Sequence, residues 1–379
     1  MSEHAELRRS VRRFVDDEVA PLLDAAESAG QMSNELLALL RRQGYNGLRI
    51  GQEWGGQALG FADFCVVLEE FARLGPSLHF WLVDSLGLTL QRLGTAAQKE
   101  RYLRPYAGWE MTGSLAFTEP DAGSDAGAIR TRAMRCPGGW RINGCKHYIS
   151  RGDTADFYFV TAVTDPERGA RGGISTFLID RHAPGVSVPR VDVSMGSSLH
   201  KLAEIVFEDC FVSDEAVVGE VGFGFLAAMK TLDDGRLAVA STCLGTAQGL
   251  LESMVEHARQ RRTFGLPLSD RQGIRWMIAD TVTEIELGRA LLQASMARLE
   301  SGEPLGANAS ICKLHLSEAL GRIADRAVQI HGGAGLLRGQ RVERLYRDVR
   351  FLRVGEGTSE VQRMLIARSV LGRPSRDGD

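Results

Sequence analysis

The sequence predicts an α+β protein of several domains: a helical domain at residues 1–108, a mostly antiparallel β-domain at 109–222 and a helical bundle at 223–379. Three observations support this order. The chain has 379 residues, more than one hydrophobic core usually organises. Its two ends repeat apolar residues at helical spacing, whereas its middle consists of short β-branched and aromatic runs. Because no long helical segments separate those runs, a parallel doubly wound sheet is disfavoured.

The helical pattern starts close to the N-terminus. In "LRRSVRRFVDDEVAPLL", Leu7, Val11, Phe14 and Val19 fall near one helical face. The stretches "FADFCVVLEEFARLG" and "LGTAAQKERYLRPYA" have the same period. The texture changes near "GSLAFTEPDAGSDAG", after which the strand-like runs are "DFYFVTAV", "GISTFLID", "GVSVPRV" and "EIVFEDCFV".

Long helices return after residue 223 and are typical of a bundle. An apolar stripe over residues 274–299 predicts a core or subunit-interface face rather than a cofactor site; its members are Ile274, Ile278, Val282, Ile285, Leu292, Met296 and Leu299. The glycine clusters "VGFGF" and "HGGAG" do not lie between a strand and a helix of a βαβ unit, so a Rossmann dinucleotide site is disfavoured.

Composition excludes several classes of function. The net charge is −3 and no basic block is evident, so we expect no nucleic-acid partner. Histidines and cysteines lack metal-ligand spacing, so we expect no metal site. The six cysteines are thinly spread, which is typical of reduced thiols in a cytoplasmic protein. We see no secretory signal and no apolar run long enough to span a membrane.

One carboxylate has an unusual setting. Glu356 stands between Gly355 and Gly357, directly before "TSEVQR", which is typical of a helix start. One interpretation is a flexible turn with an acid near a helix N-terminus. The other is a general base held where a substrate must approach the backbone. The stretch alone leaves both open.

Two segments around the β-region also have chemical potential. In the loop "LAFTEPDAGSDAG", small residues and hydroxyls suit the approach of an anion or a ring edge, although a plain turn is the alternative. In "WRINGCKHYISRGDTADF", the Asn143-Gly144 pair predicts a hairpin turn. Alternation then places His147 and Ile149 on one face of the following strand and Tyr148 and Ser150 on the other. The aromatic ring and the hydroxyl on one face could cover a planar ring and bond its edge; an ordinary half-buried hairpin strand is the alternative.

Two segments in the C-terminal region complete the set. "RQRRTFGLPLSDRQ" contains arginines that can bind a pyrophosphate, with Phe264 able to pack on an adenine, although a basic helix end is an equal alternative. "QIHGGAG" contains another close-approach loop. Thr358 and Ser359 are N-cap candidates, so free amides should point outward at that helix start.

Taken together and in this order, the motifs resemble the acyl-CoA dehydrogenase family over nearly the whole chain. "TEPDAGSDAGA" is close to the family's signature, with Asp121 in place of a glycine. "RRTFG", "QIHGGAG" and "EGTSEVQR" match three further signatures, and "GTAAQKERYL" and "TLDDGR" match two lesser ones. The resemblance implies an FAD enzyme that dehydrogenates the α,β-bond of an acyl-CoA.

The resemblance also implies a role for individual residues. Glu356 falls on the family's catalytic base. Substrate contacts fall on Ser124, Arg236, Gly355 and Gly357. FAD contacts include a set that would reach the flavin of a neighbouring subunit, namely Arg261, Thr263, Phe264, Gln272, Gln329, Gly332 and Gly333. The remaining FAD contacts are Leu115, Phe117, Thr118, Gly123, Ser124, Tyr148 and Ser150, with Thr358 and Glu360 at the helix start.

Three features of the sequence bear on what the resemblance implies. Gly355 replaces a residue that is often bulky, which would admit branched or bulky acyl groups. "MGSSLHKL" lacks the usual Arg-Gly-Ser pattern, which puts phosphate and substrate contacts there in doubt. Some relatives carry the base at the position of Gly235, which cannot serve here.

Partners and rival functions follow from the same resemblance. It implies an electron-transfer flavoprotein as electron acceptor and a homodimer or homotetramer. Rival functions are a dehydrogenase of acyl-carrier-protein thioesters, a flavin oxidase or monooxygenase on the same fold, and a silent member that serves as a scaffold.

Overall fold

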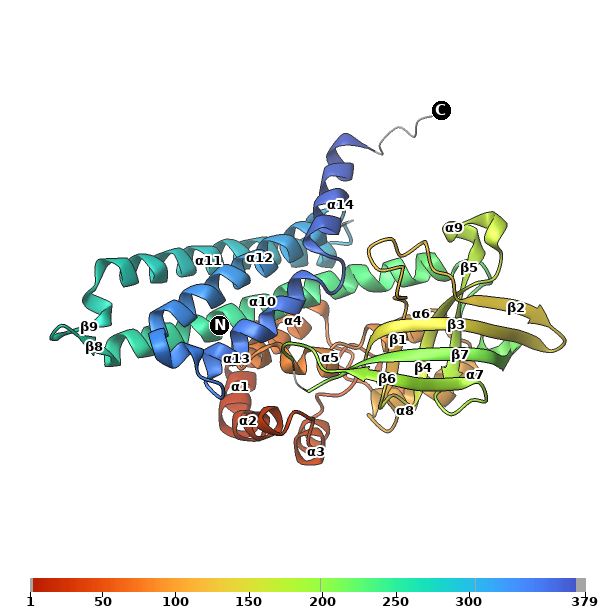
Figure 1. Cartoon of the computed structure of the whole chain (residues 1–379), viewed down its shortest axis with the longest axis horizontal. Helices are drawn as coiled ribbons and strands as arrows, with labels where there is room; N and C mark the ends of the chain where they lie inside the picture. The colour runs from red at the N-terminus through yellow and green to blue at the C-terminus, as the bar shows by residue number, and fades with distance from the viewer. Residues whose placement is uncertain (1–2, 198, 304, 373–379) are drawn as a thin grey trace.

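Helices occupy both ends of the chain and one sheet occupies its middle in the computed structural model, which describes residues 3–197, 199–303 and 305–372 (Figure 1). The N-terminal helical part consists of α1 (Glu3–Phe14), η1 (Val15–Val19), α2 (Ala20–Ala29), α3 (Asn34–Arg42), α4 (Phe61–Ala72), α5 (His79–Leu82), α6 (Ser85–Leu93), α7 (Ala96–Gln98), η4 (Lys99–Leu103) and α8 (Arg104–Ala107). The apolar face predicted for the first helices is confirmed, since Val11 and Val19 are buried.

The middle of the chain forms a mostly antiparallel sheet, as predicted. Within the described residues it has seven strands in the order β1-β4-β2-β3-β7-β6, with β5 paired to β4. β1 and β4 pair in parallel, as do β2 and β4 at a single position, and the remaining pairs are antiparallel. The strands are β1 (Gly113–Ala116), β2 (Arg132–Cys136), β3 (Gly139–Ser150), β4 (Phe157–Val163), β5 (Ile174–Asp180), β6 (Val186–Asp192) and β7 (Leu202–Ser213).

The hairpin predicted at Asn143-Gly144 is wrong. β3 continues through both residues, and the turn between β2 and β3 lies earlier, where Gly138 has φ +78°. Asn143-Gly144 instead marks an irregularity in the pairing of β3 with β7. A Cβ at Gly144 would lie 2.5 Å from Thr131 Oγ1, so glycine serves close packing here rather than a turn.

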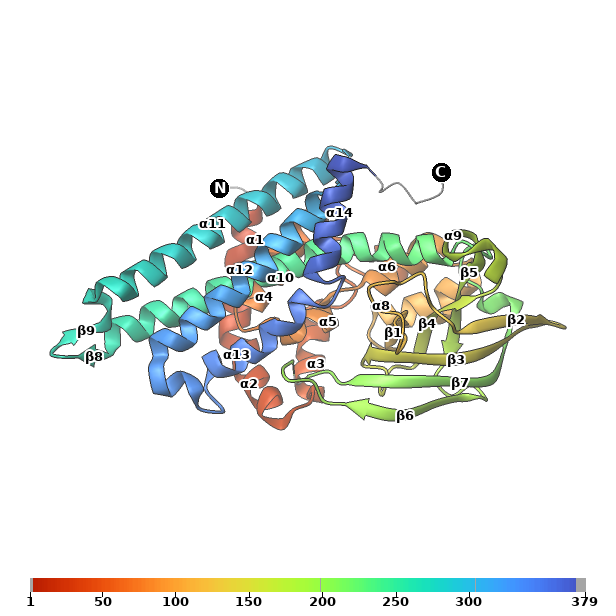
Figure 2. The same ribbon diagram turned by 45° about the horizontal axis from the view of Figure 1, so that its top comes forward.

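The C-terminal part is a bundle of long helices, as predicted. It contains α10 (Gly224–Gln260), α11 (Gln272–Glu300), α12 (Asn308–His331), α13 (Arg341–Asp348) and α14 (Ser359–Leu371). A small hairpin, β8 (Arg262–Thr263) and β9 (Leu266–Pro267), joins α10 to α11 at the end of the bundle far from the sheet (Figure 2). Of the apolar stripe on α11, Ile285 and Leu292 are buried, whereas Val282 is 41% exposed.

Close backbone contact joins the N-terminal helices to the bundle. A Cβ at Gly245 or Gly249 of α10 would lie 2.0 Å from the carbonyl oxygen of Glu69 or Arg73 respectively, at the end of α4. Only glycine permits that approach. One hydrophobic cluster therefore spans α1 to α4 and the bundle, while a second fills the sheet.

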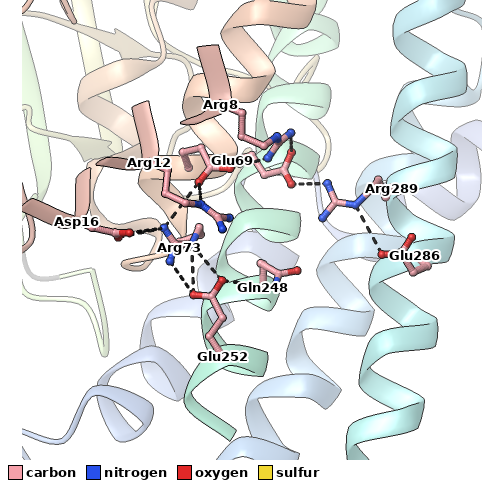
Figure 3. Close-up of polar contacts among 10 residues, drawn as sticks. Arg8, Arg12, Asp16, Glu69, Arg73, Gln248, Glu252, Glu286 and Arg289 are labelled. Atoms are coloured by element: carbon pink, nitrogen blue, oxygen red, sulfur yellow. Dashed lines mark hydrogen bonds and ion pairs between the residues drawn. The ribbon is translucent and has the colours of Figure 1, made fainter. Parts of the chain in front are cut away.

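An ion network reinforces this junction (Figure 3). Glu70 is fully buried on α4 and accepts from Arg8 Nη1 at 2.6 Å and from Arg12 Nε at 2.8 Å. Glu69 accepts from Arg8 and from Arg289 of α11. These bonds connect α1, α4 and α11, so the network holds the N-terminal helices on the bundle.

We expect Glu70→Ala to lower the free energy of unfolding by about 2–4 kcal/mol, because removal of a buried carboxylate leaves the guanidinium groups of Arg8 and Arg12 without their acceptor. Urea denaturation measures this effect. The matched control is Glu100→Ala, which breaks the exposed Arg104–Glu100 pair and should change little. Equal effects of the two substitutions would show that the network does not stabilise the fold.

Candidate active site

Glu356 lies in a strained loop between the turn Val349–Arg353 and α14. Its φ is +56° and that of Gly357 is +88°. A left-handed backbone is uncommon for a residue with a side chain and is found at functional sites. The loop ends at Thr358, whose Oγ1 accepts from the Val361 amide at 3.3 Å, so the predicted N-cap of the helix is confirmed.

Two buried side chains hold this loop in place. Lys313 of α12 donates from Nζ to the Gly357 carbonyl at 2.7 Å. Gln362 of α14 donates from Nε2 to the carbonyls of Glu356 at 3.1 Å and Gly357 at 2.9 Å. Both side chains are 0% exposed. The strained conformation is therefore fixed by hydrogen bonds from two different helices.

The Glu356 carboxylate lies directly over Gly235 of α10. A Cβ at Gly235 would be 2.7 Å from Oε2, which is too close for any real side chain. Oε2 is buried and has no hydrogen-bond partner in the described part of the chain. Sequence analysis noted Gly235 as the alternative base position, and the geometry shows why glycine is needed here: the two positions face the same point.

Burial raises the pKa of the Glu356 carboxyl to about 7, although the positive charges of Arg236 and Lys313 oppose the rise. Burial also lowers the pKa of Lys313 to about 8, although Cys243 and Glu356 oppose that change. Arg236, for which a substrate contact is predicted, is buried on α10. A carboxyl with a pKa near neutrality can both accept and return a proton.

The space beside Gly355 is compatible with the room predicted there. A Cβ at this position would meet only Phe351, with its nearest atoms at 3.6 and 3.7 Å, which are ordinary contact distances. One of these atoms is the Phe351 carbonyl oxygen and the other is a carbon of its ring.

A second set of predicted site residues gathers where β1 ends and β3 passes. Lys146 is fully buried and donates to the Phe117 carbonyl at 3.1 Å and to Glu119 at 2.8 Å. Glu119 also accepts from the amides of Arg130 and Thr131. These bonds fix the backbone on both sides of Thr118. Leu115 and Phe117 are partly buried beside it, while Gly123 and Ser124 are exposed.

The alternation predicted over residues 147–150 is wrong in one respect. The pairing of β3 with β7 gains one residue between Lys146 and Ile149, and Tyr148 has φ +58°. This bulge turns Tyr148 onto the same side as His147, and the two rings stack at 4.0 Å. Tyr148 is nonetheless 57% exposed, as a residue that covers a ligand ring must be before the ligand binds.

The remaining predicted residues lie at the far end of the bundle. Arg261, Thr263, Phe264 and Gln272 belong to or flank the β8–β9 hairpin, and Phe264 is 96% exposed. Gln329 lies in the last turn of α12, and Gly332 and Gly333 follow directly after it. The end of α12 contacts the end of α10 through the rings of His331 and His257, whose centroids are 4.2 Å apart. One chain therefore does not bring this set to Glu356 (Figure 2).

The residues present fit a flat, partly anionic group such as FAD. Backbone at three of the predicted positions is open, since a Cβ at Gly123, Gly332 or Gly333 would meet no atom within 4 Å. Thr118 and Ser124 offer hydroxyls, and Tyr148 offers an exposed ring. Thr358 and Glu360 stand at the start of α14, where a helix favours an anion.

Sequence reasoning missed Lys313, Gln362 and Lys146. One signal was available for Lys313, because it shares a helical face of α12 with the buried residues Leu316 and Leu320. A lysine at a core-facing position demands a polar partner. "TLDDGR" is informative only at its end, because the side chains of residues 231–234 lie outside the described part.

Comparison with known proteins identifies the family. The N-terminal, middle and C-terminal domain models of acyl-CoA dehydrogenase match residues 1–110, 114–210 and 222–371. The chain belongs to the acyl-CoA dehydrogenase family, whose members are oxidoreductases. No helix in the described residues is long and apolar enough to cross a membrane.

Three relatives illustrate the range of the family. The chain is 37% identical to the caffeyl-CoA reductase-Etf complex subunit CarC of Acetobacterium woodii, covering 96% of this chain and 97% of that protein. The structure of butyryl-CoA dehydrogenase from Megasphaera elsdenii is similar, with 32% identity, a TM-score of 0.92 and coverage of 98% and 99%. An FAD complex of PigA is also similar, with 27% identity, a TM-score of 0.92 and coverage of 98% of each chain.

The raised pKa of Glu356 makes stability depend on pH. Because the carboxyl has a pKa of about 7 here and 4.5 ordinarily, its contribution is fully present below pH 4.5 and is lost as pH rises through about 7. We expect Glu356→Gln, which does not titrate, to gain about 2–3 kcal/mol relative to the wild type between pH 4.5 and 8. The free energy of unfolding of both proteins, measured at each pH, tests this. If the two proteins depended on pH in the same way, the Glu356 carboxyl would have the pKa of a group in water, which would contradict the prediction.

Lys313→Met should raise the pH range over which the Glu356 carboxyl loses its contribution to stability. The substitution removes a cation that lowers the pKa of Glu356 and keeps the side-chain volume. The pKa is read from the stability difference between this variant with and without Glu356→Gln. Lys146→Met is the matched control, since it removes an equally buried lysine from the sheet. If Lys146→Met raised the pKa of Glu356 as much as Lys313→Met does, Lys313 would have no specific effect on that pKa.

Proposed function

We propose that this protein is an FAD-dependent oxidoreductase that interconverts the single and double Cα–Cβ bond of an acyl thioester. The observation that carries the proposal is the Glu356 carboxyl group, which is held in a strained loop and has a pKa of about 7, and whose Oε2 has no hydrogen-bond partner among the described residues. Such a group is unsuited to a structural role and suited to moving a proton.

The flavin would lie between two copies of the chain. In this proposal the set around Thr118, Tyr148, Ser150 and α14 comes from one subunit, and the hairpin set around Phe264 comes from another, because the two sets lie at opposite ends of the bundle. FAD, when bound, supplies the exchange of a hydride with Cβ. A homodimer or homotetramer follows from this division.

Glu356 removes the α-proton in the dehydrogenating direction. The negative charge that develops on the thioester oxygen needs hydrogen-bond donors. The Glu356 amide is one, since no described acceptor receives a bond from it. Lys313 binds the Gly357 carbonyl, and Gln362 binds the carbonyls of both Glu356 and Gly357. These bonds keep the loop in one conformation, so they fix the Glu356 amide and carboxylate together.

Reduction of a 2-enoyl thioester is the second candidate direction. The same carboxyl in its protonated form would return the proton to Cα, and a pKa of about 7 leaves both forms populated at neutral pH. The similarity to a caffeyl-CoA reductase subunit supports this direction, and the Etf complex in that name supports an electron-transfer flavoprotein as partner. Coenzyme A is the proposed carrier, with acyl-carrier protein as the alternative.

We expect Glu356→Gln to retain its yellow colour and lose turnover by at least about a hundredfold, since the acid–base group is removed without a change of size. For the wild type, kcat/KM for dehydrogenation should rise with pH through about 7, as the carboxyl loses its proton. Anaerobic bleaching of the flavin by straight, branched and aryl acyl-CoAs measures both.

The same experiment separates the rival functions. Bleaching by acyl-CoAs together with restoration of colour by 2-enoyl-CoAs gives the preferred direction. Rapid peroxide release in air would instead identify an oxidase. A Glu356→Gln variant with near-normal turnover would contradict the assignment of the base.

A further inference from the structure

A second group of buried and partly buried polar side chains lies one aromatic layer away from the Glu356 loop. It consists of Trp81 on α5, Arg151 at the end of β3 and His200 in the segment before β7. The Arg151 guanidinium stacks over the Trp81 ring at 4.6 Å, and the Arg151 amide donates to the Lys201 carbonyl at 2.9 Å. His200 belongs to "MGSSLHKL", where the sequence departs from the family pattern.

These nitrogen atoms have too few acceptors. The only hydrogen bond of the Arg151 guanidinium in the described part of the chain is a 3.3 Å bond to the Gly113 carbonyl, and it forms no ion pair there. His200 is only 7% exposed, and its Nδ1 is buried with no partner among the described residues. Trp81 Nε1 is also buried and has no hydrogen-bond partner among the described residues. Buried polar groups in proteins normally have partners, so a cluster without them points to a ligand.

The charge in this cluster is positive and confined to Arg151. Burial, assisted by the charge of Arg151 and by His79, lowers the pKa of His200 to about 3, so the imidazole is neutral. Burial also lowers the pKa of Arg151 itself. A buried guanidinium prefers a planar anion, above all a carboxylate, which it binds through two parallel hydrogen bonds.

The backbone at Arg151 is strained as well. Its φ is +57°, which asparagine or glycine would adopt at lower cost. Strain of this kind persists where surrounding structure imposes it and occurs preferentially at ligand sites.

A row of rings joins this cluster to the proposed reaction site. Phe351 lies 3.7 Å from the position of a Cβ at Gly355. Its ring packs against Phe80 at 5.4 Å, and Phe80 packs against His200 at 4.4 Å. An acyl group with its α-carbon at Glu356 can thus follow an apolar wall and end near Arg151.

We propose that Arg151, with His200 and Trp81, binds a carboxylate at the far end of the acyl group, so that the preferred substrate is the monothioester of a dicarboxylic acid. This rests on the proposed function, because it assumes that the thioester lies at Glu356. The wall of rings holds the methylene or aryl part, and the guanidinium neutralises the charge.

The test compares pairs of CoA thioesters of equal length that differ in one carboxylate: succinyl with butyryl, glutaryl with pentanoyl and adipyl with hexanoyl. Calorimetry with the FAD-loaded Glu356→Gln protein gives each Kd without turnover. At one of the three lengths we expect the carboxylate form to bind at least tenfold more tightly than its partner. Arg151→Asn, which suits the left-handed backbone, should abolish that preference and leave the neutral thioester unchanged.

Two further variants keep the outcome clear. Arg151→Lys should retain part of the preference, and His200→Phe should reduce it while keeping the ring contact with Phe80. Arg132→Asn, at an exposed position on β2, is the control and should change nothing. Loss of FAD from Arg151→Asn would show that the arginine serves the cofactor, and equal loss of both thioesters would show a structural role; either result overturns the carboxylate site.

The failure of this inference differs from failure of the proposed function. If neutral thioesters bind and bleach the wild-type flavin but carboxylate forms bind no better at any length, only the carboxylate site is wrong. If no thioester of either kind binds or bleaches, the proposed function is wrong and the site falls with it.

Discussion

The fold depends on one constraint: a carboxylate oxygen, Glu356 Oε2, is buried without a hydrogen-bond partner among the described residues, although the residue as a whole is only partly buried. Burial of a carboxylate without a partner costs free energy, and a protein retains it only when the surrounding structure enforces it. Here the enforcement is visible. The loop that carries Glu356 is strained, Gly235 leaves the space its carboxylate needs, and Lys313 and Gln362 hold its carbonyls. The same constraint brings the pKa to neutrality.

The rest of the fold serves to bring three helices to that loop. α10 supplies Gly235 and Arg236, α12 supplies Lys313, and α14 begins directly after the loop. α4 packs in backbone contact with α10 at Gly245, which holds the N-terminal helices against the bundle. The sheet stands at one end of the bundle, where it presents the backbone around Thr118, while the β8–β9 hairpin projects from the other end (Figure 2).

Much of this could be predicted from the sequence, where local patterns decide the structure. Helical periodicity located the bundle, β-branched runs located the strands, and Thr358 was identified as an N-cap. Prediction failed where a tertiary contact overrode a local preference. Asn143-Gly144 favours a turn in isolation but is drawn into β3 by its pairing with β7, and the bulge at Tyr148 breaks the alternation that strand geometry implies.

The site divides in the same way. Glu356 was singled out because its flanking glycines and the helix start are local signals, but its role as the base was implied only by the resemblance to the family. The helical period could show that Lys313 faces the core, but its partner is a carbonyl 44 residues further along the chain, which no local pattern reveals. The partnerless nitrogens of Arg151 and His200 are invisible in sequence for the same reason.

The most direct test of the central claim measures the proton rather than the electrons. FAD-loaded protein is incubated without oxygen in deuterated buffer with an acyl-CoA, and deuterium at Cα is followed by mass spectrometry. The account predicts rapid incorporation with the wild type, rising with pH through about 7, and none above background with Glu356→Gln. Equal incorporation with both proteins would contradict the claim that the Glu356 carboxyl moves the α-proton.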